Sequence, residues 1–261
     1  MTTNQMLELV YFSPTGSSAN ILRLIAGRME LPYSETDLTD YKSRNLKRSF
    51  GSDTFALIGA PVYGGRIPTP MAERLHNMSA DGAGCAVIAV YGNRDYEDAL
   101  LELAETARGR GFLPIAAAAF IAEHSIVHSV GAGRPDFNDL GVIKDFAAAL
   151  KSKMKFTYDN PGLRELGIKG NSVYREYGGI PLKPTADRLC TNCGICAQEC
   201  PVGAIPADAP SKTDSARCIS CMRCIKVCPK GARSLNKLKL FMASKVLEAK
   251  CSSRRDPEVF I

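Results

Sequence analysis

Residues 190–201 read CTNCGICAQECP, and residues 218–229 repeat the same spacing as CISCMRCIKVCP. Each run has the form C-x2-C-x2-C-x3-C-P, and together they hold eight of the 10 cysteines of the chain. Three thiolates at this pitch can wrap three corners of a cube, whereas the extra residue before the fourth cysteine turns it away from its own loop. The proline that follows directs the chain out of the site, because its φ is fixed and it lacks an N–H. The pattern therefore predicts two four-sulfur sites, each suited to a [4Fe-4S] cluster.

Two other chemistries of cysteine explain the runs less well. Structural zinc needs only two CxxC pairs, which leaves the third cysteine and the proline of each run without a role. Disulfides are a poorer alternative, since a reducing cytoplasm keeps such thiols free. The runs resemble those of bacterial two-cluster ferredoxins, in which the last cysteine of each run binds the other cluster. The ligand sets expected from this spacing are Cys190, Cys193, Cys196 and Cys228 for the first cluster, and Cys200, Cys218, Cys221 and Cys224 for the second.

The composition indicates a globular chain with room for one large and one small domain. It has 261 residues, of which 45% are hydrophobic and 23% charged, and no apolar run is long enough for a membrane span. No secretory signal precedes Leu7, so we expect a cytoplasmic protein. The net charge of +6 is mild and gathers near the end of the chain, which favours a solvated helix face over a docking patch. No motif supports nucleic-acid binding.

The first 157 residues alternate between predicted strands and helices. Such alternation indicates a parallel sheet that is covered by helices on both faces. Cys85 lies in one of the apolar runs and is expected to be a small core residue, whereas Cys251 is expected to be an idle free thiol. The predicted strands span 6–12, 33–37, 53–60, 84–91 and 112–122, with a weak signal for the second, and the predicted helices span 17–29, 95–110 and 137–155.

The loop after the first strand is rich in hydroxyl side chains. It runs Ser13-Pro14-Thr15-Gly16-Ser17-Ser18 and leads into a helix, so that hydroxyls, free backbone N–H groups and the helix dipole meet at one point. This arrangement suits a phosphate, although alone it is equally consistent with a plain helix cap. It is neither a Walker loop nor G-x-G-x-x-G.

Two further loops follow strand ends and pair tyrosine with glycine. They span 61–68 (PVYGGRIP) and 91–96 (YGNRDY). An aromatic face beside bare backbone can approach a flat ring, and ligands of open α/β sheets bind at the carboxyl ends of strands. Ordinary glycine turns are the alternative, but three such loops at successive strand ends make that interpretation weak.

The segments VYFSPTGSSANI, IGAPVYGGRIP and VYGNRDYEDAL resemble the phosphate loop and the two flavin loops of the flavodoxin family. With the cysteine runs, the chain resembles the fused flavodoxin–ferredoxin proteins of the EFR1 family over residues 6–155 and 187–236. The resemblance implies an α/β domain with a doubly wound, five-stranded parallel sheet of order 2-1-3-4-5 that binds FMN. It also implies a C-terminal α+β ferredoxin-like domain with two clusters. The expected domain limits are 1–157 for the FMN domain, 158–186 for a linker, 187–236 for the ferredoxin-like domain and 237–261 for a basic helix and tail.

The resemblance also implies which residues bind FMN. The phosphate would be held by Ser13, Thr15, Gly16, Ser17 and Ser18. One side of the flavin ring would be lined by Pro61, Val62, Tyr63, Gly64 and Gly65, where the Gly64–Gly65 peptide matches a flexible turn of the family. The other side would be lined by Tyr91, Gly92, Asn93, Arg94, Asp95 and Tyr96, with Tyr91 or Tyr96 as the best stacking candidate. Ser18 replaces the usual threonine, and the chain is basic where flavodoxins are acidic.

Three further side chains have open roles. Arg66 and Arg94 could steady an anionic flavin or an acidic substrate, or could equally form salt bridges at the loop rim. His124 follows the fifth strand and is a candidate proton donor to a substrate, although a lone histidine is more often a structural hydrogen-bonding residue.

The remaining segments connect the domains and end the chain. Residues 158–186 are rich in glycine and proline and are expected to drape over the first domain and touch both cofactors. After the second run, apolar residues recur at helical spacing and are expected to pack a terminal helix back on the protein, a membrane-surface or partner helix being the alternative. These residues are Leu235, Leu238, Phe241, Met242 and Val246.

The number of electrons that each expected cofactor exchanges indicates the function. A flavin exchanges one or two electrons and each cluster exchanges one, so the chain is expected to transfer electrons between clusters, FMN and partner redox proteins. The alternatives are an FMN-dependent reductase of a small organic substrate, with room for that substrate over the flavin, and a redox sensor without turnover. The partners and the oligomeric state, a homodimer included, are left open.

Overall fold

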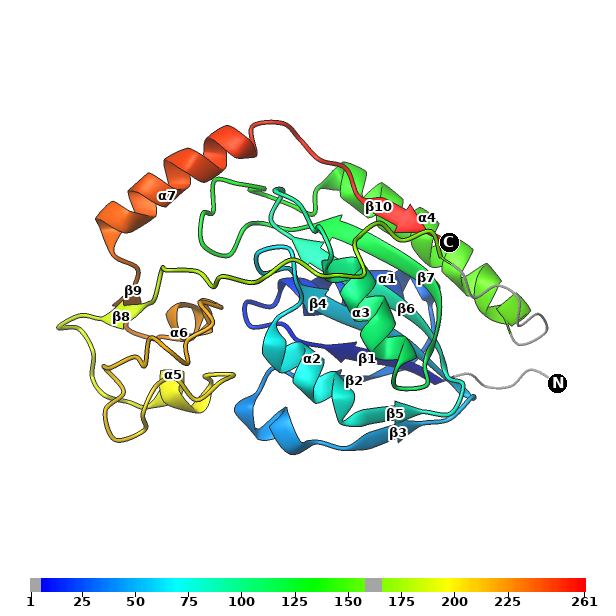
Figure 1. The fold of residues 1–261 in the computed structure, drawn as a ribbon, viewed down its shortest axis with the longest axis horizontal. Helices are drawn as coiled ribbons and strands as arrows, with labels where there is room; N and C mark the ends of the chain where they lie inside the picture. Colours follow the sequence, from blue (N-terminus) through cyan, green and yellow to red (C-terminus); the bar gives the residue numbers. More distant parts are fainter. Residues whose placement is uncertain (1–5, 158–165) are drawn as a thin grey trace.

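The computed structural model describes residues 6–157 and 166–261 of the chain (Figure 1). A six-stranded sheet forms the centre of the larger domain. Five parallel strands lie in the order β2-β1-β4-β6-β7, which is the expected order 2-1-3-4-5, and β10 adds an antiparallel edge beside β7. The strands are β1 (Met6–Tyr11), β2 (Tyr33–Asp37), β4 (Thr54–Pro61), β6 (Gly84–Tyr91), β7 (Leu113–Ile121) and β10 (Glu258–Phe260). The expectation of five strands is wrong by one, because β10 has three residues and no strand signal without its partner.

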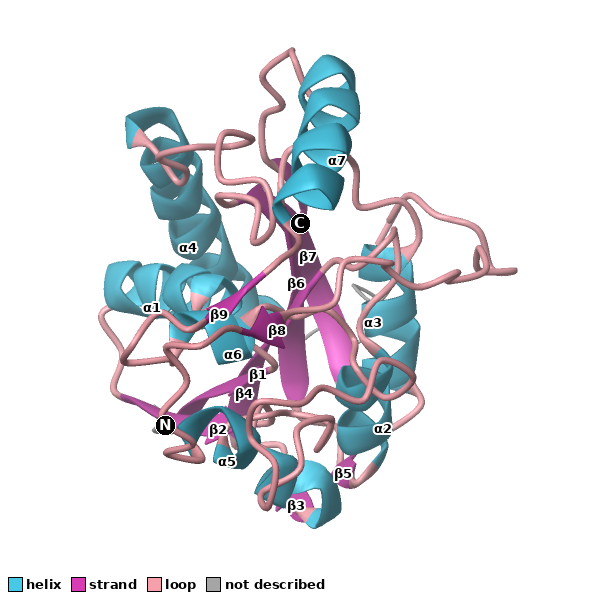
Figure 2. Cartoon of the chain, turned by 90° about the vertical axis from the view of Figure 1, so that its left-hand side faces the viewer, coloured by secondary structure: helices cyan, strands magenta, loops and turns pink. Residues whose placement is uncertain are grey.

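The sheet is buried on both faces, as a parallel sheet requires. Successive side chains of β1 alternate between two cores: Leu9 packs into one, and Val10 and Phe12 pack into the other. Helices α1 (Ser17–Met29) and α4 (Phe137–Thr157) cover the first face, and α2 (Thr69–His76) and α3 (Ala99–Arg108) cover the second (Figure 2). Cys85 is fully buried in the second core, as expected.

Several elements differ from the sequence-based expectation. Helix α3 begins at Ala99 rather than at residue 95, because Glu97 has a φ of 45° that a right-handed helix cannot include. The sequence interpretation did not include α2, the 3-10 helix η1 (Tyr41–Asn45), or the small parallel pair of β3 (Arg48–Phe50) and β5 (Met78–Ala80).

The cysteine runs form a small domain beside the carboxyl edge of the sheet. It contains two short helices, α5 (Ile195–Gln198) and α6 (Arg223–Lys226), and an antiparallel pair of β8 (Thr185–Ala186) and β9 (Arg233–Ser234). Contacts with the larger domain include Arg74, which donates to the carbonyl of Pro201, and an apolar cluster that Val127 and Leu182 share.

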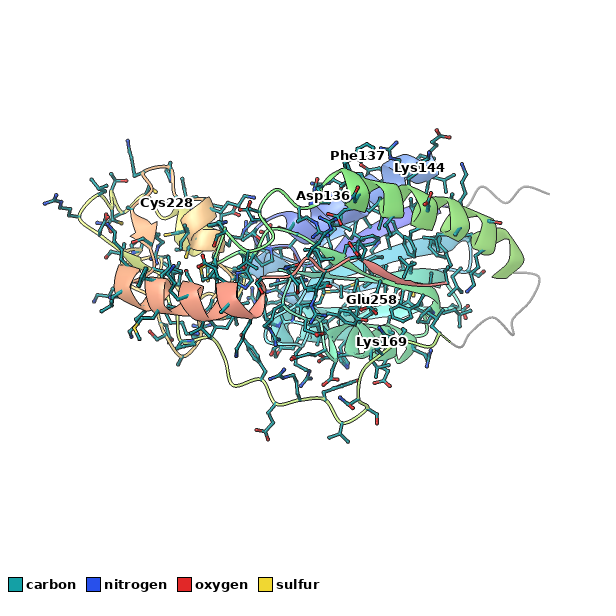
Figure 3. All side chains as sticks on the ribbon, turned by 90° about the horizontal axis from the view of Figure 1, so that it is seen from above. Asp136, Phe137, Lys144, Lys169, Cys228 and Glu258 are labelled. Atoms are coloured by element: carbon teal, nitrogen blue, oxygen red, sulfur yellow. The ribbon has the colours of Figure 1, made fainter. Side chains whose placement is uncertain are left out.

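Two segments fasten the small domain to the large one. The described part of the linker lies along α3, where the backbone N–H groups of Asn171 and Arg175 donate to Asp98 at 2.8 and 2.9 Å. At the other end, α7 (Lys237–Lys250) leads back to β10, where Glu258 accepts from Lys169 (Figure 3). The small domain is therefore held at both of its ends.

The expected packing stripe of α7 is wrong for four of its five residues. Only Leu235 is buried; the others have exposed fractions of 69% (Leu238), 60% (Phe241), 62% (Met242) and 58% (Val246). The packed face is instead formed by Leu240, Ala243 and Leu247, which contact the apolar cluster between the domains. Helical spacing alone could not choose between the two faces, because both carry apolar side chains.

In the part of the chain that the structure describes, no helix is both long and apolar enough to span a lipid bilayer.

Candidate functional site

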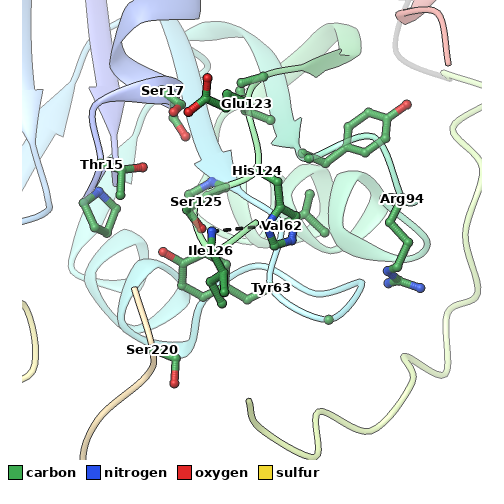
Figure 4. Close-up of a pocket in the computed structure, with 18 of the residues that line it drawn as sticks. Thr15, Ser17, Val62, Tyr63, Arg94, Glu123, His124, Ser125, Ile126 and Ser220 are labelled. Carbon is green, nitrogen blue, oxygen red and sulfur yellow. Dashed lines mark hydrogen bonds between the residues drawn. The ribbon is translucent and has the colours of Figure 1, made fainter. Parts of the chain in front are cut away.

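One pocket collects the three loops that follow β1, β4 and β6, together with the segment after β7 (Figure 4). Ligands of open α/β sheets bind at this edge. The residues of the sequence-based prediction that line it are Ser13, Thr15, Ser17, Ser18, Pro61, Val62, Tyr63, Gly64, Tyr91, Gly92, Arg94, Asp95 and His124. Gly16, Gly65, Asn93 and Tyr96 do not line it.

The hydroxyls of the first loop divide into two roles. Ser13 Oγ accepts a hydrogen bond of 3.0 Å from the backbone N–H of Ala19, so it satisfies one of the free amides in the first turn of α1, whose N-cap residue is Gly16. Gly16 has a φ of 88° and allows the tight turn into the helix. Ser18 Oγ is buried and has no hydrogen-bond partner. A buried unpaired hydroxyl costs about 1–3 kcal/mol, so this one fits a site built for a polar ligand.

The second loop is a tight turn at the pocket wall. The backbone N–H of Tyr63 donates to the carbonyl of Arg66 at 2.9 Å, and both Gly64 and Gly65 have positive φ. The ring of Tyr177, from the linker, lies against Gly64, where an added Cβ would approach it to 2.9 Å. The linker therefore closes over this loop.

The third loop sends some of its side chains away from the pocket. The hydroxyl of Tyr96 donates to Glu258 of β10 at 2.9 Å, and the amide of Asn93 binds the carbonyls of Cys251 and Ser253. Tyr91 stays in the pocket wall and packs edge-on to Tyr96 with ring centroids 5.6 Å apart. Of the two stacking candidates, only Tyr91 lies where a ligand could meet it.

The two arginines of these loops form ion pairs. Arg66 bonds Glu102 at 2.7 Å, which raises the pKa of Arg66, and it also donates to the carbonyl of Arg175 at 2.8 Å. Arg94 bonds Glu97 at 2.9 Å while it lines the pocket. Arg66 therefore has the salt-bridge role of the two alternatives, whereas Arg94 forms a salt bridge and also remains within reach of a ligand.

His124 is held by its own loop. Its Nδ1 accepts from the backbone N–H of Ile126 at 3.2 Å (Figure 4) and from that of Val127 at 3.0 Å. Because both partners are donors, the ring proton resides on Nε2. Burial, reinforced by the positive charges of His128 and Arg94, lowers its pKa to about 4. A neutral ring of this kind can donate a hydrogen bond from Nε2 but is a weak acid catalyst at neutral pH.

The structure adds residues to the pocket that the sequence did not indicate. Glu123, Ser125 and Ile126 flank His124, and Ile180 and Ser220 come from the linker and the second cysteine run. Glu123, Ser125, Ile126 and Ser220 are close in sequence to predicted site residues, whereas Ile180 has no such sequence signal.

The second set of cysteines lines one apolar cavity. Cys218, Cys221 and Cys224 come from the second run, and Cys200 joins them from the first. This is the arrangement that crossed ligation requires. The backbone N–H of Ala204 donates to Cys200 Sγ at 3.2 Å. Burial raises the pKa of Cys221 to about 12, so uptake of a metal cluster there would displace a proton.

A buried arginine, Arg233, lies beside the first set of cysteines, and the sequence did not indicate it. Arg233 is 2% exposed, and its Nε donates to Cys196 Sγ at 3.2 Å. Burial raises the pKa of Cys228, but hydrogen bonds from the backbone N–H groups of Lys230, Ala232 and Arg233 outweigh it, and the pKa is lowered overall. Donors directed at sulfur stabilise thiolates, which suits cluster ligands.

All 10 cysteines lie in the described residues, where none forms a disulfide. Within the described ranges, no three histidine, cysteine or acidic side chains lie close enough together to hold a single metal ion.

The second set of cysteines is the one beside the pocket. Ser220 lies between two of its members and lines the pocket itself. The pKa of Tyr63, in the pocket wall, is raised by burial and, to a smaller extent, by the nearby Cys221. The linker connects the same places: Lys183 donates to the carbonyl of Cys218, and Ser220 Oγ donates to the carbonyl of Ile180 at 3.1 Å.

Comparison with known proteins gives one family match and several structural similarities. Residues 189–232 match the family model described as a 4Fe-4S dicluster domain. Among solved structures, a flavodoxin from the domain Archaea is similar with a TM-score of 0.39 and 15% identity over 58% of this chain and 99% of that chain. Oxidised flavodoxin 2 from Bacillus cereus gives 0.42 and 16% over 57% and 99%, and an NADH:FMN oxidoreductase in its apo form gives 0.42 and 12% over 62% and 94%. No curated protein sequence matches significantly.

The strand order and the family match define the class of protein. The chain joins a flavodoxin-like α/β domain to a 4Fe-4S dicluster domain.

Proposed function

We propose that this protein transfers electrons between two [4Fe-4S] clusters and FMN, and so couples one-electron redox partners to flavin chemistry. The observation that carries the proposal is Ser220, which stands between Cys218 and Cys221 and also lines the pocket of the three flavodoxin-type loops. Bound FMN would exchange one or two electrons, and each cluster would exchange one.

The residues that line the pocket suit the phosphate and the flavin ring of FMN. Ser18 Oγ supplies an unpartnered buried hydroxyl at the phosphate loop, beside the N-terminus of α1. Tyr91 supplies an aromatic face, and Gly64 and Gly92 supply bare backbone in the pocket wall. The flavin-binding residues in this proposal are those of the three loops that line the pocket, with Arg94 at the rim.

The proposed electron path runs through both cysteine sets in a fixed order. The set of Cys200, Cys218, Cys221 and Cys224 would bind the cluster next to FMN. The set of Cys190, Cys193, Cys196 and Cys228 would bind the outer cluster, and its Cys193 is exposed at the surface. A redox partner would therefore exchange electrons at the outer cluster. In this proposal the FMN domain spans residues 1–157 and the linker 158–186. The ferredoxin-like domain spans 187–236, and the basic helix and tail span 237–261.

The content of the purified protein tests the proposal first. Protein prepared without oxygen should contain one FMN and about eight iron atoms per chain, from two four-iron clusters. Iron near four, zinc in place of iron, or no flavin would contradict it.

Cysteine variants test the path. Cys221→Ser should remove the inner cluster and nearly abolish flavin reduction by an external one-electron donor, whereas Cys190→Ser should remove the outer cluster and slow the same reaction. Cys251 lies outside both runs, so Cys251→Ser is the matched control and should leave the rate of flavin reduction unchanged. The measurement is stopped-flow absorbance of the flavin under anaerobic conditions. Equal rates in the wild type and both cluster variants would overturn the path.

A second candidate function is reduction of a small organic substrate. A cavity of about 500 Å³ has mainly apolar walls and shares five lining residues with the flavin pocket: Thr15, Ser17, Glu123, Ser125 and Ile126. The neutral, loop-bound His124 does not supply an acid for such a reaction, which is why we place this candidate second. An anaerobic screen that follows reoxidation of the reduced protein by small molecules separates the two functions.

A further inference from the structure

Two cations of the iron–sulfur domain lie on the phosphate loop of the other domain. The ammonium group of Lys226, at the end of α6, donates to the carbonyl of Thr15. The guanidinium group of Arg223, at the start of α6, donates to the carbonyl of Pro14 at 3.2 Å. Lys226 Nζ lies 3.3 Å from the place that a Cβ on Gly16 would occupy. The loop that precedes α1 is therefore covered by the second domain.

One acidic side chain, Glu123, lines both the flavin pocket and the neighbouring cavity at this point, but it is hydrogen-bonded to His128 and not to Lys226. A helix N-terminus carries a partial positive charge, and the first turn of α1 has no acidic residue. Arg223 is paired with Glu199 and lies 3.8 Å from Asp40, but Lys226 forms no ion pair with an acidic side chain of residues 6–157 and 166–261. Lys226 is exposed to solvent, and together with the helix N-terminus it offers two positive groups to an anion that binds between them.

Unpartnered polar atoms mark the same junction. In the described part of the chain, Ser18 Oγ and Arg223 Nε are both buried without a hydrogen-bond partner. Ser18 lines the flavin pocket, whereas Arg223 contacts the Pro14 carbonyl beside it and lines neither that pocket nor the neighbouring cavity. Thr15 and Ser17 line the flavin pocket and also the neighbouring cavity that Lys226 lines. The loop hydroxyls and the lysine can thus reach one ligand.

We propose that Lys226, with Arg223 beside it, completes the phosphate site of FMN, so that the cofactor phosphate is bound by both domains. This inference rests on the proposed function, and it adds a ligand that the flavodoxin-type loop does not contain. A phosphate dianion would compensate the helix N-terminus and Lys226, whereas Arg223 already has Glu199 as its ion-pair partner. Because the phosphate bridges the domains, flavin binding and docking of the iron–sulfur domain favour each other by the same free energy.

Riboflavin, which lacks the phosphate, provides the matched ligand for the test. Flavin-free protein with its clusters intact is titrated anaerobically with FMN and with riboflavin, and the Kd is measured from quenching of flavin fluorescence. Lys226→Met should raise the Kd for FMN about tenfold at low ionic strength, the range of one charge-assisted hydrogen bond. The Kd for riboflavin should change by less than about twofold, and the effect on FMN should shrink at high salt.

Two further variants keep the result interpretable. Lys226→Arg should restore most of the FMN affinity, and Lys226→Glu should weaken FMN binding more than Lys226→Met does, again without effect on riboflavin. Lys239→Met, on the exposed surface of α7, is the matched control and should change neither Kd. Cluster absorbance confirms that each variant is folded.

The outcomes separate this inference from the function on which it rests. If Lys226→Met changes the Kd of both flavins equally, or of neither, Lys226 does not bind the phosphate and the inference is overturned. If the wild type binds neither flavin, the proposed function itself fails.

Discussion

The imidazole of His124 shows how a single residue can be fixed by its surroundings. It lies at the edge of the pocket, against Gly92, with two backbone N–H groups on Nδ1. These donors hold the segment after β7 in a turn only while Nδ1 keeps its lone pair. Protonation would convert an acceptor into a donor that faces two donors. The geometry therefore keeps the ring neutral and assigns His124 a structural part in the pocket wall.

The pH dependence of stability tests this role. The pKa of His124 is lowered from 6.5 to about 4 in the folded protein, chiefly by burial. As the pH falls from 6.5 to about 4, the unfolded chain takes up the proton and the folded chain does not. The contribution of this residue to the free energy of unfolding is complete above pH 6.5 and falls by about 1.4 kcal/mol per pH unit within that window.

His124→Asn keeps an acceptor near the position of Nδ1 but does not titrate. Its thermal midpoint should therefore fall less than that of the wild type between pH 6.5 and 4.5. Parallel curves for the two proteins would contradict the proposed role. His128→Asn, at an exposed histidine, is the matched control.

At the scale of an element, α7 shows why apolar spacing is not sufficient to define a packed face. The helix carries apolar residues on two sides, and the cluster between the domains contacts the side with Leu240, Ala243 and Leu247. The other side, with Leu238 and Phe241, is exposed although it has the more regular apolar stripe. Tertiary contact therefore selected the face that the sequence did not indicate.

A pair of leucine substitutions measures this choice. Leu240→Ala should destabilise the protein by about 1–2 kcal/mol, because a half-buried side chain loses contacts in the inter-domain cluster. Leu238→Ala should change stability by less than about 0.5 kcal/mol, because the side chain is mostly in solvent. The measurement is the thermal midpoint of the cluster-loaded protein. The assignment of the packed face is wrong if Leu238→Ala is the more damaging change.

At the scale of the whole molecule, the chain end connects the two domains. After α7, Arg254 pairs with Asp136 and Asp139, and β10 then hydrogen-bonds to the apolar edge strand β7. An exposed apolar edge is a site for pairing with another chain, and β10 covers this one. The tail thus holds the iron–sulfur domain in place and protects the sheet.

Removal of residues 252–261, which include β10, tests whether the tail stabilises the protein and covers the edge of β7. The truncated protein should have a lower thermal midpoint and should self-associate with rising concentration, as measured by light scattering, because the edge of β7 is uncovered. Lys169→Ala removes only a surface ion pair with Glu258, worth about 0–1 kcal/mol, and is the control. A truncated protein that matches the full chain in size and stability would show that β10 does not protect the sheet.

The sequence by itself determined the features that depend on local spacing. The cysteine runs, the three strand-end loops and the alternation of strands and helices each use residues within about a dozen positions, and their geometry follows from φ preferences and side-chain periodicity. These signals predicted the parallel sheet, the pocket at its carboxyl edge and the meeting of Cys200 with Cys218, Cys221 and Cys224, whereas the strand order was implied by the resemblance to flavodoxins.

Only the tertiary structure decided what distant segments do to one another. Lys226 lies 211 residues from Thr15, and Tyr96 and Asn93 turn away from the pocket because Glu258 and the tail backbone bind them. The edge strand β10, the packed face of α7, and the position of Ser220 beside the loops are of the same kind. Such pairings have no local signal, since nothing in the neighbouring sequence of either partner indicates the other, and the contact exists only in the folded chain.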